Sequence, residues 1–346
     1  MKKHEKIMKK CLLEAKKAKL NTFLNPLVGA ILTDLEGNIL STGYHKKYGE
    51  AHAEVNCIKK HQGSFENTIL YVNLEPCSHY GKTPPCADLI IEKGIKKVII
   101  AIKDPNPKVA GAGIEKLKKA GVEVVVGILE DEAKELNKVF LKNIKNKKPY
   151  ISTKIATTLD GKIATTNKSS KWITGEKSRK FVRKIRDSHY AIMSASGTIL
   201  ADNSSLKGDK RKITRIILDK NGEIPLDFKV FEKDGARIIY STNSNRDLPK
   251  HIEQIPFESY DKLMKTLYSM GIPSILVEAG CGLNSELLKA KEIDYIYQFI
   301  APKIIGEGIS YADKIQKNDI NLAIRIKNEK TTKIDDDILV QGKILY

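Results

Sequence analysis

Residues 52–54 read His-Ala-Glu, and residues 76–86 read Pro-Cys-Ser-His-Tyr-Gly-Lys-Thr-Pro-Pro-Cys. These segments carry three soft ligands, the imidazole of His52 and the thiols of Cys77 and Cys86. Zn²⁺ prefers tetrahedral coordination by nitrogen and sulfur, and it becomes catalytic when the fourth position is left to water. We therefore expect these three side chains to hold one zinc ion with an open corner.

Glu54 lies two residues beyond His52, close enough to touch a water molecule on the metal without binding the metal itself. Zinc lowers the pKa of its water to roughly 7, so a carboxylate here can take a proton and pass it to departing ammonia. The His-x-Glu motif alone, or a pair of cysteines alone, is common in proteins that bind no metal. Together, His-x-Glu, a strand-like run and Pro-Cys are typical of zinc deaminases that act on pyrimidines or purines. Glu54 is the predicted general acid and base.

The spacing of the two cysteines departs from the general deaminase signature. Eight residues separate Cys77 from Cys86, whereas the signature has two. The longer insert carries His79, Lys82 and Thr83, which are polar or cationic. We expect these three side chains to contact an anionic substrate.

Residues 76–86 (PCSHYGKTPPC), with residues 25–29 (NPLVG) and 104–107 (DPNP), resemble the pyrimidine deaminase domain of the bifunctional riboflavin biosynthesis proteins. In that family a deaminase precedes a reductase, and the resemblance covers nearly the whole chain. It implies that Asn25 contacts the substrate and that the substrate is a small phosphorylated pyrimidine.

Alternating strand-like and helix-like segments in the first half predict a sheet covered by helices. The expected helices cover residues 4–20, 52–60, 85–93, 113–120 and 130–145, and the expected strands cover residues 28–33, 38–43, 68–75, 97–102 and 122–127. The resemblance implies a cytidine-deaminase-like domain with three layers, α/β/α.

The length of 346 residues favours two domains. The polar segment 146–149 ends in proline, and a new apolar strand follows at residues 150–157. With the resemblance, this boundary predicts a zinc-dependent pyrimidine deaminase domain over residues 1–146 and an NADPH-dependent reductase domain over residues 150–346.

The second half shows no cluster of metal ligands in its sequence. Residues 154–164 (KIATTLDGKIA) predict a strand, a turn and a strand, and residues 170–174 (SKWIT) contain the only tryptophan. With residues 197–202 (GTILAD) and 277–284 (VEAGCGLN), they resemble the reductase domain of the same family, which is related in fold to dihydrofolate reductase and uses NADPH. The expected fold is therefore α/β in both domains, the second being dihydrofolate-reductase-like.

The resemblance also assigns roles in the second half. It implies contacts with NADPH from Ala156, Trp172, Thr198, Asp202, Ser241, Gly280, Cys281, Gly282, Leu283, Asn284, Ser285 and Glu286. It implies contacts with the substrate from Ser170, Arg186, Leu206 and Glu278, and Lys154 is the candidate for positioning the sugar or donating a proton. The predicted strand 274–278 runs through a glycine-flanked turn into a predicted helix at 284–291, where backbone N–H groups can hold phosphate.

The segment after Asp202 departs from the family. The family usually continues with a proline, a Leu-Thr pair and an arginine that helps to hold the phosphate, whereas residues 203–211 here read NSSLKGDKR. The proline is absent, and the arginine is not at its expected place. Lys210 and Arg211 are the candidates to replace it.

The formal net charge of +18 raises the question of nucleic-acid binding. Lysines are spread among glutamates along the expected helices, and aromatic residues make up only 6%, so we expect a solvated basic surface instead. A positive field still helps to gather phosphorylated ligands.

The sequence contains no apolar run of about 18 residues, and its N-terminus lacks the apolar core of a signal peptide. Two of the five cysteines are expected zinc ligands, which favours a reducing compartment. We therefore expect a cytoplasmic protein that binds neither nucleic acid nor a membrane. A homo-oligomer is also expected, although no residue pattern gives the oligomeric state.

Two alternatives remain open. A tRNA or other nucleic-acid base deaminase with an appended binding domain would suit the basic charge, although the long cysteine insert and the reductase-like second half argue against it. A zinc-stabilised binding protein would need a closed site with four ligands, whereas the sequence offers three ligands and Glu54.

Overall fold

The computed structural model describes residues 2–80, 84–106 and 110–346. The chain forms two compact units, Met1–Lys147 and Lys148–Tyr346, each with its own sheet. In the described part of the chain, none of the helices combines the length and the apolar character that a bilayer crossing requires.

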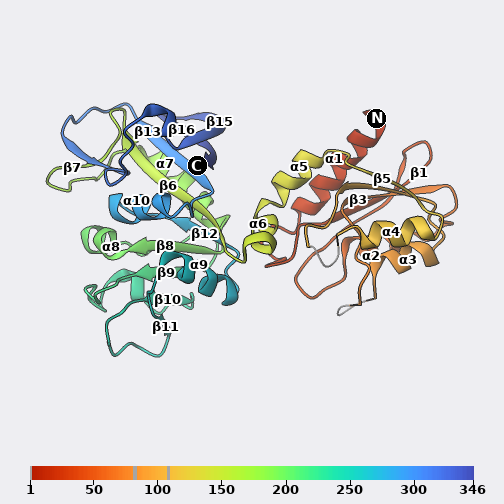
Figure 1. Cartoon of the computed structure of the whole chain (residues 1–346), viewed down its shortest axis with the longest axis horizontal. Helices are drawn as coiled ribbons and strands as arrows, with labels where there is room; N and C mark the ends of the chain where they lie inside the picture. The colour runs from red at the N-terminus through yellow and green to blue at the C-terminus, as the bar shows by residue number, and fades with distance from the viewer. Residues whose placement is uncertain (1, 81–83, 107–109) are drawn as a thin grey trace. The chain divides into compact units, whose positions relative to one another are not determined.

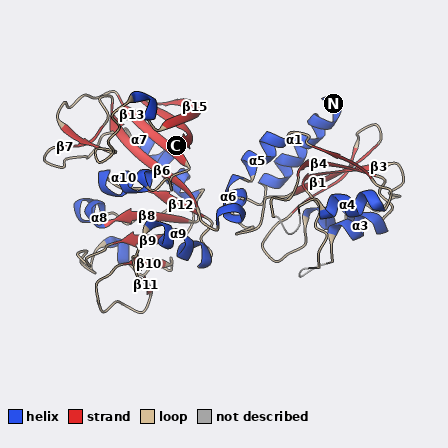
Figure 2. Cartoon of the chain, in the orientation of Figure 1, coloured by secondary structure: helices blue, strands red, loops and turns tan. Residues whose placement is uncertain are grey.

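The first unit is a five-stranded sheet with helices on both faces (Figure 1, Figure 2). The strand order is β2-β1-β3-β4-β5, in which β1 pairs antiparallel with β2 and β3, and β3, β4 and β5 run parallel. Helices α1 and α5 cover one face, and α2, α3 and α4 cover the other, which gives the expected three layers. The elements are α1 Lys2–Lys16, β1 Gly29–Asp34, β2 Ile39–Tyr44, α2 Ala53–Ile58, β3 Thr68–Leu74, α3 Cys86–Glu92, β4 Lys97–Ile102, α4 Ala112–Lys119, β5 Glu123–Val126, α5 Glu130–Leu136 and α6 Lys138–Asn146.

Strand β3 lies at the centre of this sheet, and all seven of its residues are buried. A strand buried on both faces reads as a nearly continuous apolar run, as TILYVNL does. Because β3 and β4 are parallel, their carboxyl ends meet at one edge of the sheet. The turn that carries Cys77 therefore starts beside the segment that follows β4.

Two predicted helices of the first unit differ from the observed ones. The helix expected over 130–145 is divided at Asn137, whose buried amide accepts a hydrogen bond from Leu27 N (2.8 Å) and donates one to Leu27 O (3.0 Å). The helix expected to reach residue 20 ends at Lys16, and Lys19 has a φ of 51°, which lies outside the α-helical region. A tertiary contact thus accompanies the break at Asn137, and a change of backbone conformation follows the end of α1.

The second unit contains a nine-stranded sheet in the order β11-β10-β9-β8-β12-β6-β13-β16-β15. The strands from β11 to β13 run parallel, and β16 and β15 add an antiparallel edge. The elements are β6 Tyr150–Thr158, β7 Lys162–Thr165, α7 Glu176–Asp187, β8 Ala191–Ala195, α8 Ser196–Asp202, β9 Thr214–Leu218, β10 Ile238–Ser241, β11 Ile252–Ile255, α9 Tyr260–Ser269, β12 Ser274–Val277, α10 Cys281–Lys289, β13 Tyr295–Ala301, β14 Gly308–Ser310, β15 Arg325–Ile334 and β16 Asp337–Leu345. Open α/β sheets bind ligands at the carboxyl ends of their parallel strands. Strands β8 and β12 are parallel neighbours, so their carboxyl ends lie at one such edge.

Helix α10 begins at Cys281, three residues before the predicted start at Asn284. The Asn284 side chain donates to the carbonyls of Ala279 (2.7 Å) and Gly280 (3.1 Å), so it fixes the turn from within the first helical turn. The predicted boundary was wrong because this asparagine bonds backwards along the chain.

Gly113 provides a test of how α4 is held beside the Cys77 turn. A Cβ at this position would collide with the carbonyl oxygen of Pro76, whereas a Cβ at Gly197 would meet no atom within 4 Å. We expect Gly113→Ala to lower the free energy of unfolding of the first unit by ~1–3 kcal/mol, as overpacking usually does. Urea unfolding of the whole chain checks this, with Gly197→Ala as the control; equal midpoints for the two variants would contradict it.

Candidate active sites

Three side chains from separate elements meet at the edge of the first sheet. His52 precedes α2, Cys77 follows β3, and Cys86 is the first residue of α3. His52 Nδ1 lies 3.5 Å from Cys77 Sγ and 3.3 Å from Cys86 Sγ, and the three ligand atoms lie within 4.8 Å of one another. Tetrahedral zinc with bonds of ~2.0–2.3 Å needs ligand atoms at about this separation. The predicted ligand set therefore fits zinc.

The protonation of the two thiols also suits a cation. A hydrogen bond from the Cys86 thiol, with further contributions from His52, lowers the pKa of Cys77 well below its usual range. The same hydrogen bond and burial raise the pKa of Cys86. The backbone N–H of Cys86 also donates to Cys77 Sγ (3.3 Å). Two thiols and an imidazole are thus in contact, and a divalent cation bound among them would compensate the charge of the thiolates.

Glu54 lies in the first turn of α2 and is only 3% exposed. Burial raises the pKa of this carboxyl to about 7. Its Oε2 atom is buried and has no hydrogen-bond partner in the described part of the chain. Such an atom is costly unless a ligand completes it, so the geometry supports a proton carrier that faces a bound molecule.

Asn25 is connected to the metal ligands through His45, a residue that the sequence did not single out. His45 is 3% exposed; its Nε2 lies 3.2 Å from Asn25 Nδ2, its Nδ1 lies 3.2 Å from Ala51 O, and its ring meets the His52 ring edge to face at 5.7 Å. Because a carbonyl only accepts, Nδ1 carries the proton and Nε2 accepts from the Asn25 amide. The Asn25 amide oxygen is then left to accept a hydrogen bond from a ligand.

Glu75 was also missed, although it immediately precedes the Pro-Cys pair. Its carboxylate accepts hydrogen bonds from four backbone N–H groups, those of Asp104 (3.0 Å), Gly111 (3.0 Å), Gly113 (2.9 Å) and Ile114 (3.3 Å). These bonds attach the segment after β4 to the turn of Cys77. In the sequence Glu75 appears only as a carboxylate at the end of an apolar strand, which does not by itself indicate this role.

The insert between the cysteines is described only in part. His79 is exposed in the turn after Cys77. The predicted substrate contacts Lys82 and Thr83, and Pro107 of the downstream motif, lie outside the described residues.

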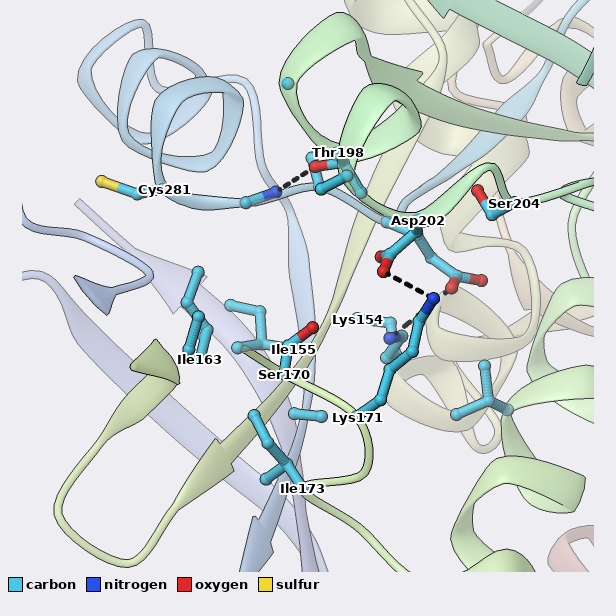
Figure 3. Close-up of a pocket in the computed structure, with 18 of the residues that line it drawn as sticks. Lys154, Ile155, Ile163, Ser170, Lys171, Ile173, Thr198, Asp202, Ser204 and Cys281 are labelled. Carbon is cyan, nitrogen blue, oxygen red and sulfur yellow. Dashed lines mark hydrogen bonds and ion pairs between the residues drawn. The ribbon is translucent and has the colours of Figure 1, made fainter. Parts of the chain in front are cut away.

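The second unit contains a cavity of about 1300 Å³ (Figure 3). It is larger than the ~300–1,000 Å³ of a typical ligand pocket, so it has room for a cofactor and a substrate together. Most residues predicted from the sequence line it: Lys154, Ala156, Ser170, Trp172, Arg186, Thr198, Asp202, Leu206, Glu278, Gly280, Cys281, Gly282 and Leu283.

Glu278 is the buried acid of this cavity and is 8% exposed. Arg186 binds it through Nε (2.6 Å) and Nη2 (2.9 Å), and Lys154 Nζ lies 3.5 Å away. Burial alone would raise the pKa of this carboxyl, but the charges of Arg186 and Lys154 hold it at about 2. Glu278 is therefore an ionised, rigidly oriented acceptor.

The starts of α8 and α10 also line this cavity. Thr198 Oγ1 accepts a hydrogen bond from Gly280 N (2.9 Å) (Figure 3), and among the described residues no side-chain cap is found at the N-terminus of α10. Asp202 lies 3.4 Å from Lys171 Nζ. Free N–H groups at the start of a helix suit a phosphate group of a dinucleotide.

Several predicted residues do not line this cavity. Ser241 ends β10 and is buried, and its Oγ has no hydrogen-bond partner in the described chain. Ser285 is also buried. Asn284, which holds the turn, accepts a hydrogen bond from Thr153 Oγ1 (2.7 Å). Glu286 is not part of the lining. Lys210 and Arg211 do not line it either, and Arg211 instead donates to Asp187 O (3.1 Å).

Two protein families match successive parts of the chain. Residues 1–102 match the family described as the cytidine and deoxycytidylate deaminase zinc-binding region, and residues 149–340 match the RibD C-terminal domain. The predicted fold class and the two expected cofactors, zinc and NADPH, are confirmed by these matches.

Relatives match both halves at once. The riboflavin biosynthesis protein RibD of Aquifex aeolicus is 38% identical over 344 residues, covering 96% of each chain, and that of Escherichia coli is 34% identical, covering 87% of this chain and 88% of the relative. A solved Thermotoga maritima structure, described as a diaminohydroxyphosphoribosylaminopyrimidine deaminase/5-amino-6-(5-phosphoribosylamino)uracil reductase, has a TM-score of 0.89 at 36% identity and covers 99% of both chains. The chain belongs to the bifunctional riboflavin biosynthesis proteins, in which a zinc-dependent deaminase is joined to an NADPH-dependent reductase.

Proposed function

We propose that residues 1–146 remove ammonia from a diaminopyrimidine ribosylamino phosphate, and that residues 150–346 reduce the ribosyl chain of the product to a ribityl chain. The observation that carries the first step is the free Oε2 of Glu54, buried two residues from a ligand set that fits zinc. The name of the Thermotoga relative and the order of the two family matches support both steps.

In the first site, His52, Cys77 and Cys86 would hold the metal. Bound zinc supplies Lewis-acid chemistry that makes water a nucleophile near neutral pH. Glu54 Oε2 takes a proton from the water while the water oxygen bonds to the ring carbon. Glu54 then delivers this proton to the amino group as the C–N bond breaks. A carboxyl with a pKa near 7 can hold a proton between these events.

Asn25 orients the pyrimidine in this proposal. Its amide oxygen accepts a hydrogen bond from an N–H of the ring or of an amino group. The hydrogen bond to His45 prevents the Asn25 amide from exchanging the positions of its nitrogen and oxygen. His79, Lys82 and Thr83 stay predicted substrate contacts.

In the second site, NADPH would lie against Ala156, Trp172, Thr198, Asp202 and the 280–283 turn. The cofactor supplies the hydride, and the protein supplies placement. Glu278 and Arg186, with Ser170 and Leu206, hold the sugar while Lys154 Nζ donates a proton to the ring oxygen as its bond to C1 breaks. Contacts from Ser241, Asn284, Ser285 and Glu286 stay predictions.

We also place the enzyme in the cytoplasm, because thiol ligands must stay reduced to bind zinc. Its ligands are small molecules, not nucleic acid or membranes, and the homo-oligomer stays a prediction.

The variant Glu54→Gln tests the first site. We expect zinc content and folding to persist while ammonia release from the diaminopyrimidine substrate falls by ~10²–10⁴-fold, because the amide cannot transfer the proton. Metal analysis measures the zinc content and an ammonia assay measures the release, with the exposed Glu50→Gln as control. Unchanged ammonia release by Glu54→Gln would refute the assignment.

The variant Lys154→Met tests the second site. The methionine keeps most of the side-chain length but cannot donate a proton, so we expect NADPH oxidation with the deaminated substrate to fall by ~10²–10⁴-fold. Absorbance of NADPH measures it, and an unchanged affinity for NADPH in a binding titration shows that the second unit is folded. A rate equal to that of the parent chain would exclude Lys154 as the donor.

Glu278 should make the second unit sensitive to acid. Its pKa is about 2 when folded and ~4.3 when unfolded, so its contribution of ~3 kcal/mol is complete above pH ~5 and is lost as the pH falls towards 2. Glu278→Gln should therefore unfold more easily than the parent at pH 7 and lose less stability on going to pH 3. Urea unfolding at both pH values checks this, with the exposed Glu307→Gln as control; an acid loss as large as in the parent would contradict it.

A further inference from the structure

The reductase cavity is unusually rich in positive charge. Basic side chains outnumber acidic ones among its described lining residues, and α7 alone contributes Arg179, Arg183 and Arg186. Their spacing of four and three residues places them on one face of the helix. The three arginines differ in what they already bind.

Two of these arginines are engaged within the protein. Arg179 donates to Thr174 O (2.7 Å) and lies over the Trp172 ring at 4.5 Å. Arg186 binds both oxygens of Glu278 and also donates to Lys207 O (2.8 Å). These contacts fix the orientation of both guanidinium groups and use part of their donors.

Arg183 is different, because its guanidinium makes no hydrogen bond in the described part of the chain. Its nearest acid is Asp209, with Nε and Oδ1 4.0 Å apart, beyond hydrogen-bonding distance. The side chains of Arg183 and Asp209 are 46% and 49% exposed. Because Arg183 lines the cavity, its full set of donors is available to a ligand there, one helical turn from Arg186, which holds Glu278.

We propose that Arg183 binds the phosphate group of the reductase substrate and that Asp209 weakens this contact by attracting the same guanidinium. This inference rests on the proposed function, in which Glu278 and Arg186 hold the sugar and the phosphate lies a few bonds away. Guanidinium is suited to the task, since its planar fork can donate two parallel hydrogen bonds to phosphate.

Three variants of the full-length chain test the proposal. Arg183→Gln removes the charge, Lys184→Gln removes the neighbouring exposed charge, which does not line the cavity, and Asp209→Asn removes the competing acid. The KM for the deaminated ribosylamino phosphate is compared with that for its dephosphorylated form.

We expect Arg183→Gln to raise the KM for the phosphorylated substrate by roughly 10–100-fold, as loss of a charged hydrogen bond does, and to leave that for the dephosphorylated form unchanged. Lys184→Gln should change neither, and Asp209→Asn should lower the KM for the phosphorylated form. An unchanged KM in Arg183→Gln, or equal losses for the two substrates, would overturn the proposal.

Inorganic phosphate gives a second measurement that needs no turnover. Arg183→Gln should bind it more weakly than the parent or Lys184→Gln in a calorimetric titration, and equal binding would overturn the proposal. A parent chain that consumes no NADPH with the deaminated substrate would instead refute the proposed function, and the phosphate titration would still decide the role of Arg183.

Discussion

Both active sites depend on how a buried carboxylate is stabilised. An acid taken out of water either becomes protonated or finds cations. Glu54 has no hydrogen-bond partner for Oε2 in the described chain, and burial raises its pKa to about 7, which suits a group that must gain and lose a proton. Glu278 lies against Arg186 and Lys154, which keep it ionised, and this suits a fixed acceptor. In the proposed function, the same residue type thus serves proton transfer in one unit and substrate positioning in the other.

The residues that build the first site are held by bonds from side chains to distant backbone. Glu75 accepts hydrogen bonds from four backbone N–H groups of the segment that follows β4. Asn137 forms hydrogen bonds with both the N–H and the C=O of Leu27. His45 connects Asn25 to the loop before His52. None of these residues is proposed to take part in the chemistry. They fix the backbone from which the ligands and Asn25 project, so the site depends on packing across the whole sheet edge.

The difference between the residues of the proposed chemistry and the residues that support them explains what the sequence could predict. Zinc ligands are chemically specific and occur in a motif, so His52, Cys77, Cys86 and Glu54 could be named in advance, and β3 was predicted to within one residue. The supporting residues could not, because a hydrogen bond between a side chain and a distant backbone group leaves no pattern of residue types. For a related reason the break at Asn137 and the early start of α10 were missed, since both depend on asparagine side chains that bond backbone groups. Ser241 was placed near the cofactor by resemblance alone, and the structure leaves it outside the cavity.

The net charge of the chain says little about its ligands, but the distribution of cations on α7 is informative. Lysines of this helix pair with acids at the surface, Lys177 with Asp335 and Lys180 with Glu176. Its arginines at 179, 183 and 186 line the cavity instead. Lysine is strongly hydrated and flexible, whereas the arginine fork is weakly hydrated and matches planar or tetrahedral oxyanions. The helix therefore separates its cations by position, with these lysines in exposed ion pairs and the arginines along the cavity, which total charge alone cannot distinguish.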